Sequence, residues 1–207
     1  MTIIRTIEGL HLEQYLEIEY EMVQHVFEPT LFTWIVPPTV IYGRHQVREQ
    51  EVNDAFCSSH GVRVVQRKSG GGCVYADKGN LMISFISPST HNQEVFDSFL
   101  LMLAKALNEL GYEAVTTAHN DVLVADRKVA GTACYTVPTG TVVHACILYD
   151  VDLQALEKAI TPSAEKLQKH AVQSVRQRVR NLREIKDFGC INTFRQAIEN
   201  TLTKSKI

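Results

Sequence analysis

Three consecutive glycines stand in a stretch that otherwise has the pattern of a β-strand, RKSGGGCVYADKGNLMISF at residues 67–85. Glycine inside a strand usually marks a bulge, or a place where a ligand lies close to the main chain. Cations and small polar side chains surround these glycines: Arg67, Lys68 and Ser69 before them, and Asp77, Gly79 and Asn80 after them. Backbone N–H groups and cations gathered in this way suit an anionic ligand. A simple flexible turn is the alternative.

The common nucleotide-binding fingerprints do not explain the glycines. A Walker A loop needs Gly-Lys-Ser/Thr at the opening of a helix, and neither feature follows Gly72. The GxGxxG spacing of a dinucleotide-binding loop is also absent. An anionic ligand would therefore be recognised in another way.

A second polar group lies where two apolar strands are predicted to form a hairpin. Lys128 stands in that hairpin, where a lysine has few structural uses, and Asn120 and Asp121 begin the first strand. A fixed cation can stabilise negative charge that develops on carbonyl or phosphate oxygens. A solvated turn lysine and an Asx turn are the structural alternatives. His144, inside a later apolar strand, has the pattern of a structural histidine.

Composition limits the class of protein. The chain has 207 residues, 45% hydrophobic and 21% charged, which fits one packed domain over residues 1–207 or at most two small ones. A net charge of −2 predicts neither nucleic acid nor a membrane surface as a partner. The N-terminus lacks the zones of a signal peptide, and the most apolar stretch is too short to span a bilayer. Five irregularly spaced cysteines indicate reduced thiols in the cytoplasm rather than zinc ligands.

The order of predicted elements favours an α+β fold with a mostly antiparallel sheet. Residues 11–27 have helical spacing, with Glu19 as the single misfit on the apolar face, and residues 49–60 and 92–110 also read as helices. Strands are predicted at 31–36, at 39–43, before Arg67 and at 80–87, and four more fill residues 113–151, with turns at 126–127 and 138–140. Helical patterns return at 152–160 and near the C-terminus. Adjacent runs of strands argue against a Rossmann-type alternation.

Five motifs, in the same order, resemble those of lipoate–protein ligases, which are related to biotin protein ligases and octanoyltransferases. The glycine stretch is similar to RRxSGGGAVYHDxGNLxxS, and residues 119–133 resemble the segment in which Asn-Asp precedes a GRKxSGxA turn. The remaining three matches are TVIYGRHQ (39–46), VVHACILYDVDL (142–153) and SVRQRVRNL (174–182). The matches extend from about residue 31 to residue 185.

The resemblance implies a fold and a chemistry. The fold is a mixed α+β catalytic domain of the biotin/lipoate protein ligase type, with a curved sheet flanked by helices. Lipoate or octanoate and ATP, with Mg²⁺, would condense to an acyl-AMP. The acyl group would then pass to a lysine of a lipoyl-carrier domain, in a 2-oxoacid dehydrogenase complex or the glycine cleavage H protein. No tightly bound metal is implied, and biotin is a less favoured substrate.

The resemblance also implies roles for particular residues. Lys128 would be the catalytic cation, Arg67 would contact the phosphate, and Asp121 could help to bind magnesium. The glycines would lie against the acyl chain and the acyl-phosphate. The substrate- and adenylate-binding set would be Arg67, Ser69, Gly70, Gly71, Gly72, Cys73, Val74, Tyr75, Asp77, Gly79, Asn80, Asn120, Asp121, Gly131, Thr132, Ala133, His144 and Ala145.

The chain departs from the family pattern at several positions. Gln66 stands where the family often has an arginine, Cys73 replaces an alanine, and Ala145 with Cys146 replaces Gly-Thr. The chain is expected to be a catalytic domain without the C-terminal accessory domain of larger ligases. A separate accessory subunit is one possibility, and transfer of an acyl group made elsewhere is another.

Two other functions remain open at this point. An octanoyl or lipoyl transferase would act through a cysteine thioester, yet Ser163 stands where such a transferase has its cysteine. Cys73, Cys134 and Cys146 could take that role only as thiolates, and burial disfavours a thiolate. A non-catalytic lipoyl-AMP-binding protein is the third class, and an intact Lys128 argues against it.

Four arginines repeat at short spacing near the last motif, at Arg176, Arg178, Arg180 and Arg183. A solvated basic face is the usual reading of such a run. A docking patch for an acidic lipoyl-carrier domain is the competing hypothesis.

Overall fold

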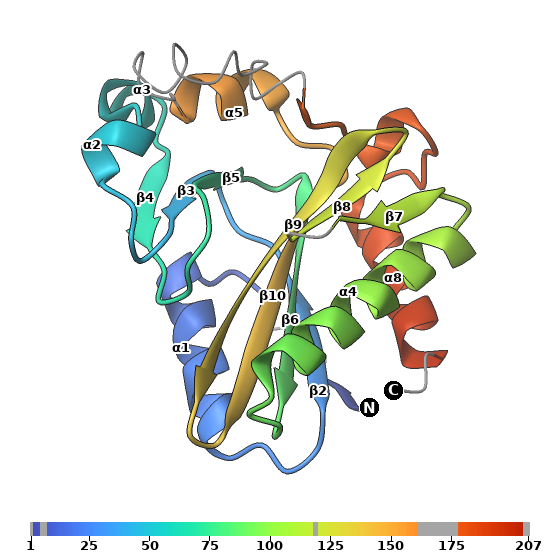
Figure 1. The fold of residues 1–207 in the computed structure, drawn as a ribbon. Helices are drawn as coiled ribbons and strands as arrows, with labels where there is room; N and C mark the ends of the chain where they lie inside the picture. The colour runs from blue at the N-terminus through green and yellow to red at the C-terminus, as the bar shows by residue number, and fades with distance from the viewer. Residues whose placement is uncertain (1, 5–7, 118–119, 161–177, 205–207) are drawn as a thin grey trace.

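The computed structural model describes residues 2–4, 8–117, 120–160 and 178–204 (Figure 1). Within these ranges the larger sheet has seven strands in the order β1-β2-β6-β10-β9-β8-β7. β1 is parallel to β2, and every other neighbouring pair is antiparallel. The strands are β1 Thr2–Ile4, β2 Thr30–Trp34, β6 Asn80–Ser87, β7 Ala114–Thr116, β8 Asp121–Val124, β9 Arg127–Val137 and β10 Gly140–Leu148.

A smaller sheet carries the glycine segment. Its strands are ordered β4-β3-β5, with β3 parallel to β4 and antiparallel to β5. Residues 67–73 connect β4 to β5, so the three glycines lie beyond one end of this sheet. The strands are β3 Thr39–Tyr42, β4 Arg63–Gln66 and β5 Val74–Ala76.

Helices cover both faces of the larger sheet. α1 (Leu12–Gln24) packs against β6 and β10 on one face, and α4 (Asn92–Glu109) packs against β9 and β10 on the other (Figure 1). α8 (Ile191–Lys204) lies beside α4. The other described helices are α2 Arg48–Glu51, α3 Asp54–Ser59, α5 Leu153–Ala159 and the 3₁₀ helix η1 Leu182–Glu184.

β10 is buried along its whole length because helices cover both of its faces. Val143, Ala145 and Ile147 belong to the core under α4, whereas Val142 and Cys146 belong to the core under α1. Side chains alternate between faces along a strand, so a strand buried on both faces has an almost continuous apolar sequence. Thr141 and His144 are the polar residues in this run.

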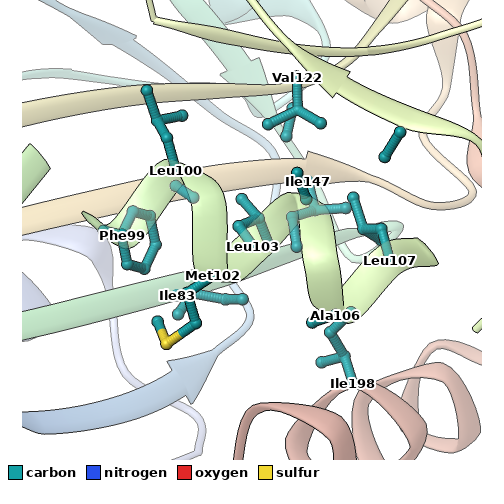
Figure 2. Packing of buried hydrophobic residues seen from close by; sticks show 14 of the residues in the cluster. Ile83, Phe99, Leu100, Met102, Leu103, Ala106, Leu107, Val122, Ile147 and Ile198 are labelled. Carbon is teal, nitrogen blue, oxygen red and sulfur yellow. The ribbon is translucent and has the colours of Figure 1, made fainter. Parts of the chain in front are cut away.

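The helix predicted at 92–110 is confirmed, and it supplies much of the core. Figure 2 shows Phe99, Leu103 and Leu107 of α4 directed at the sheet and its neighbours, with Ile147 of β10 and Ile198 of α8 in the same cluster. Apolar residues three and four positions apart share one helix face, which explains why this helix could be read from the sequence.

The predicted α+β fold with a mixed, mostly antiparallel sheet is confirmed, and three details differ. The helix predicted at 49–60 is two helices, because the Asn53 side chain accepts a hydrogen bond from Phe56 N at 3.1 Å and starts α3 anew. The hairpin turn is at Ala125–Asp126, both with positive φ, and not at 126–127. β1 was not predicted from the sequence. No helix in the described ranges is long and apolar enough to cross a membrane.

Candidate functional site

An apolar cavity lies between α1, the glycine segment and the larger sheet. It encloses about 600 Å³ of empty space, part of it open to solvent. The expected catalytic residue Lys128 lines it, together with ten residues expected to bind substrate: Arg67, Gly72, Cys73, Val74, Asn120, Gly131, Thr132, Ala133, His144 and Ala145. Residues that are distant in the sequence therefore meet around one space.

Six further residues line the cavity: Leu12, Leu16, Trp34, Ile41, Met82 and Cys146. The sequence reasoning missed the first five, and it named Cys146 only as a departure from the family pattern and as a candidate thiol. All are side chains that a sequence assigns to a hydrophobic core, so only the fold reveals that they face an open space. These residues give the cavity its apolar walls.

Lys128 lies on the cavity wall near the start of β9, directly after the Ala125–Asp126 turn. Its Nζ lies 2.6 Å from Oδ1 of Asp121 on the neighbouring strand β8, and about 28% of its side chain is exposed. The β8–β9 pairing is irregular between Val122 and Leu123. Such an irregularity re-aims the side chains beside it. Lys128 is thus a half-buried cation held in one place.

Gly131 makes room for the Lys128 side chain. A Cβ placed on Gly131 would lie 2.9 Å from both Cε and Nζ of Lys128. Distances below 3.0 Å between such atoms are repulsive, so a larger residue would displace the ammonium group. The glycine is thus a steric requirement of the Lys128 position.

The SVRQRVRNL motif contacts the main chain of Lys128. Lys128 forms an isolated parallel β-bridge with Val179, and its carbonyl accepts a hydrogen bond from Arg180 N at 2.9 Å. Asn181 fixes this segment, because its amide bonds both N and O of Val151 at 2.9 Å. The part of SVRQRVRNL that the structure describes therefore holds the catalytic candidate's backbone.

Arg67 is buried, and it shapes the glycine segment. Its Nε donates to Ser69 Oγ at 3.0 Å, and its Nη2 donates to the carbonyls of Gly70 and Gly72 at 2.8 and 2.7 Å. Its Nη1 donates to Ile41 O at 3.1 Å. Burial lowers the pKa of this guanidinium. Every nitrogen of Arg67 thus has a main-chain or hydroxyl partner, which a phosphate would have to share or replace.

Asp77, Gly79 and Asn80 form a buried turn and do not line the cavity. Asn80 Oδ1 accepts from Asp77 N at 2.8 Å, and Asp77 accepts from Gly79 N at 2.7 Å and from Asp152 N at 3.1 Å. A Cβ on Gly79 would collide with the carbonyl oxygen of Asp150. This turn joins β5 and β6 to the segment after β10. Burial, the largest cause, raises the pKa of Asp77.

The remaining candidates do not line the cavity. They are Ser69, Gly70, Gly71, Tyr75 and Asp121. Gly71 has φ of 93°, a conformation that favours glycine. Tyr75 is buried beside Asp77.

Asn120 and Thr132 are bound to each other across β8 and β9. Thr132 N and Oγ1 both donate to Asn120 O at 2.9 Å, and Asn120 Nδ2 donates to Thr132 O at 3.0 Å. Both residues line the cavity. Their mutual bonds hold the wall beside Lys128 in a fixed shape.

Two of the three candidate cysteines are poorly suited to thioester chemistry. Burial raises the pKa of the Cys146 thiol to about 12, and Asn80 Nδ2 donates to its sulfur at 3.2 Å. Burial also raises the pKa of Cys134. A thiolate is the nucleophile in such reactions, so these two thiols are poor nucleophiles at neutral pH. Ser163 lies outside the described residues.

Two of the repeated arginines are paired with acids. Arg183 contacts Asp150 at 2.6 Å and Asp187 at 3.1 Å, and Arg180 contacts Glu184 at 3.3 Å. These pairs reduce the free positive charge of the segment that was considered as a docking patch. Arg178 is exposed, and Arg176 lies outside the described residues.

The described residues contain no group of side chains that would hold magnesium without a nucleotide. Among the residues placed in the structure, no three His, Cys, Asp or Glu side chains are grouped to hold a metal. Asp121, the expected ligand, has its Oδ1 against Lys128. Magnesium bound through nucleotide phosphates needs only one or two carboxylates.

Comparison with known proteins identifies the family to which this fold and this cavity belong. Residues 11–203 match the model of the lipoyl protein ligase A/B catalytic domain. The chain belongs to this family. It is 34% identical over 171 residues to lipoate–protein ligase 1 of Staphylococcus aureus, an alignment that covers 82% of this chain and 52% of that protein. The chain thus spans about half the length of this curated relative.

Two solved structures show the same fold. One is a bi-partite lipoate protein ligase from Thermoplasma acidophilum, described with its E2 lipoyl domain, at 25% identity and a TM-score of 0.80, covering 98% of this chain and 81% of that one. The other is LipL1 of Plasmodium falciparum in complex with lipoate, at 25% identity and a TM-score of 0.81, covering 99% and 62%.

Proposed function

We propose that this protein transfers a lipoyl group from lipoyl-AMP to a lysine of a lipoyl-carrier domain, after activation of lipoate with ATP. The observation that carries the proposal is Lys128, a positioned cation on the wall of an apolar cavity beside Asp121. Family membership supports the same chemistry. The carriers would be lipoyl domains of 2-oxoacid dehydrogenase complexes or the glycine cleavage H protein.

The chemistry needs positioned charge more than a nucleophile. The acceptor amine attacks the acyl carbonyl carbon, the bond to the phosphate oxygen breaks, and AMP leaves with the electron pair while the amine loses a proton to solvent. Negative charge grows on the carbonyl and phosphate oxygens, and Lys128 would stabilise that charge. The apolar walls would hold the acyl chain and exclude the water that would hydrolyse the adenylate.

Other residues of this chain would bind and orient the adenylate. Asn120 and Thr132 offer a fixed polar wall, and Arg67 keeps the glycine segment in place. Magnesium, where it takes part, would be held by phosphate oxygens with Asp121 as the candidate protein ligand. The five free thiols support a cytoplasmic location.

The decisive experiment separates activation from transfer. The protein is incubated with lipoate, octanoate or biotin, each with Mg-ATP, and acyl-AMP is detected by mass spectrometry. In parallel, synthetic lipoyl-AMP and an unmodified lipoyl domain are supplied, and the mass increase of the domain is measured. We expect lipoyl-AMP to bind and its acyl group to be transferred.

Two results would refute the proposal. One is the absence of any binding of a non-hydrolysable lipoyl-AMP analogue in calorimetry. The other is a hydroxylamine-sensitive acyl adduct on a cysteine, which would favour the thioester transferase. Transfer from lipoyl-AMP without formation of acyl-AMP from ATP would restrict the activity to the second step, for which a separate accessory subunit is one explanation.

A further inference from the structure

Glu19 is a fully buried carboxylate on the apolar face of α1. It does not line the cavity, yet two hydrogen-bond chains that start at cavity residues end on it. A buried carboxylate is costly unless hydrogen bonds compensate for its lost hydration. The hydrogen bonds from its neighbours Ser84 and His144 compensate for this cost.

The first chain starts at Trp34. The indole Nε1 donates to Ser84 Oγ at 2.7 Å, and Ser84 Oγ lies 2.5 Å from Glu19 Oε1. An indole N–H can only donate, so the hydroxyl oxygen of Ser84 accepts from Trp34 and its hydrogen is free for the carboxylate. Glu19 is thus the final acceptor of this chain.

The second chain starts at Arg67. Its Nε donates to Ser69 Oγ at 3.0 Å, and Ser69 Oγ lies 3.0 Å from His144 Nε2. On the other side of the ring, His144 Nδ1 lies 3.4 Å from Glu19 Oε2. A guanidinium can only donate, so Ser69 Oγ accepts from Arg67 with one lone pair. Its hydroxyl hydrogen and its second lone pair let it either donate to His144 Nε2 or accept from it.

The two neighbours of the ring act differently on its state, because a carboxylate can only accept whereas Ser69 can donate or accept. If Nε2 accepts from Ser69, it has a lone pair, and the single ring proton of a neutral His144 is on Nδ1, facing Glu19. A proton on Nε2 alone would set the Nδ1 lone pair against the Glu19 carboxylate, and a doubly protonated ring would leave the Ser69 hydrogen without this acceptor. The neutral ring with its proton on Nδ1 satisfies both chains.

We propose that Glu19 is a positioning residue that holds His144 in the Nδ1–H tautomer and, through His144 and Ser69, holds Arg67 against the glycine segment. Arg67 in turn fixes the carbonyls of Gly70 and Gly72. The proposed tautomer of His144 follows from these contacts and does not depend on the proposed function. Its effect on acyl transfer rests on the proposed function.

The primary test is the protonation of His144 in solution. The protein is labelled with ¹⁵N-histidine, and the His144 signal among the eight histidines is assigned from its loss in His144→Asn. We expect a protonated Nδ1 and an unprotonated Nε2 near neutral pH. A proton on Nε2, or on both nitrogens, would overturn the proposal whether or not the protein transfers lipoyl groups.

Ser69→Ala separates the influence of Glu19 from that of Ser69. If Glu19 holds the ring, the Nδ1–H tautomer persists in Ser69→Ala because the carboxylate still accepts from Nδ1. A change of tautomer in this variant would assign control to Ser69 and contradict the proposal. This variant leaves α1 and its core contacts unaltered.

Glu19→Met removes the acceptor and keeps a side chain of similar length on the apolar face. We expect a mixture of His144 tautomers and a loss of about 10- to 100-fold in kcat/KM for transfer from lipoyl-AMP, because small displacements of positioning groups have effects of this order. Glu17→Met, at an exposed position of the same helix, is the matched control and should change neither readout. A pure Nδ1–H tautomer with unchanged transfer in Glu19→Met would refute the proposed role.

Discussion

Lys128 and Asp121 face each other across the β8–β9 hairpin, with Nζ 2.6 Å from Oδ1. Lys128 lines the cavity and Asp121 does not, so the carboxylate contacts the ammonium group from outside the cavity. Gly131 leaves space for the lysine side chain, and Val179 and Arg180 hold its backbone. Side-chain and main-chain contacts therefore converge on one cation.

Removal of the Lys128 ammonium group should lower the rate of acyl transfer much more than it lowers the stability of the fold. Lys128→Ala should lower acyl transfer by about 100-fold or more, since one well-placed donor contributes on the order of 3 kcal/mol to the transition state. Lys128→Arg should restore little, because a planar guanidinium does not replace a compact ammonium group. Transfer from synthetic lipoyl-AMP is the measurement, with circular dichroism as the control for folding. A well-folded Lys128→Ala with most of its activity would place the chemistry elsewhere.

A methyl group at position 131 should displace the lysine without removing it. The added Cβ of Gly131→Ala would lie 2.9 Å from Lys128 Nζ. Because a shift of about 1 Å in a catalytic group can cost on the order of 100-fold in rate, we expect a loss of about 10- to 100-fold in kcat. Thr136→Ala, at an exposed position of the same strand, is the control. Equal activity of the two variants would show that Lys128 tolerates the displacement.

The sequence predicted the elements with strong periodicity and the residues with unusual chemistry. The 92–110 helix and the four strands of 113–151 were found because their apolar residues repeat at 3.6 or 2 positions. Lys128 and His144 were singled out because a charged or polar group in an apolar strand is uncommon. The structure places both on the cavity wall.

Other features depend on contacts between distant residues, which a single sequence does not contain. Glu19 was recognised only as a misfit, because its partners Ser84 and His144 come from β6 and β10. Trp34 was not singled out from the sequence, because only the fold shows that it lines the cavity. The roles of Asp77 and Asn80 in a buried turn likewise follow from hydrogen bonds that join three segments.

The cysteine thiols should be dispensable for transfer. At neutral pH a thiol with a pKa of about 12 is ionised in only about one molecule in 100,000, so Cys146 has almost no nucleophilic form. Cys73, Cys134 and Cys146, changed to alanine one at a time, should keep transfer from lipoyl-AMP within several-fold of the parent. Abolished turnover in one well-folded variant would favour the thioester mechanism.

The buried thiol of Cys146 should also make stability depend on alkaline pH. Its folded pKa, about 12, is raised by burial above the ordinary value of 9.0, so between these values the unfolded chain releases a proton that the folded protein retains. The contribution of Cys146 to stability is therefore present below about pH 9 and is lost as pH rises toward 12. Urea unfolding of Cys146→Ala at several pH values should show a weaker decline than the parent. Equal slopes would indicate that the thiol is not buried in solution.

Asn181 provides the last test, because it connects the final motif to the body of the domain. Its amide bonds both N and O of Val151, and it is buried. Asn181→Ala would leave two buried main-chain groups without these partners, at a cost of about 1–3 kcal/mol for each unsatisfied group. Urea unfolding should show this loss, and transfer should fall because Val179 and Arg180 no longer hold the Lys128 backbone firmly.

Asn108→Ala is the matched control for Asn181→Ala. Asn108 also bonds N and O of a single residue, Ala114, on the far side of the larger sheet near α4 and β7. The Asn108→Ala variant should lose about as much stability as Asn181→Ala. It should keep the parent's kcat for transfer at temperatures where it is folded. If both variants lose activity in proportion to stability alone, the bridge to Lys128 has no specific role. If Asn181→Ala loses kcat beyond its loss of folded protein, the last motif acts by holding the lysine in place.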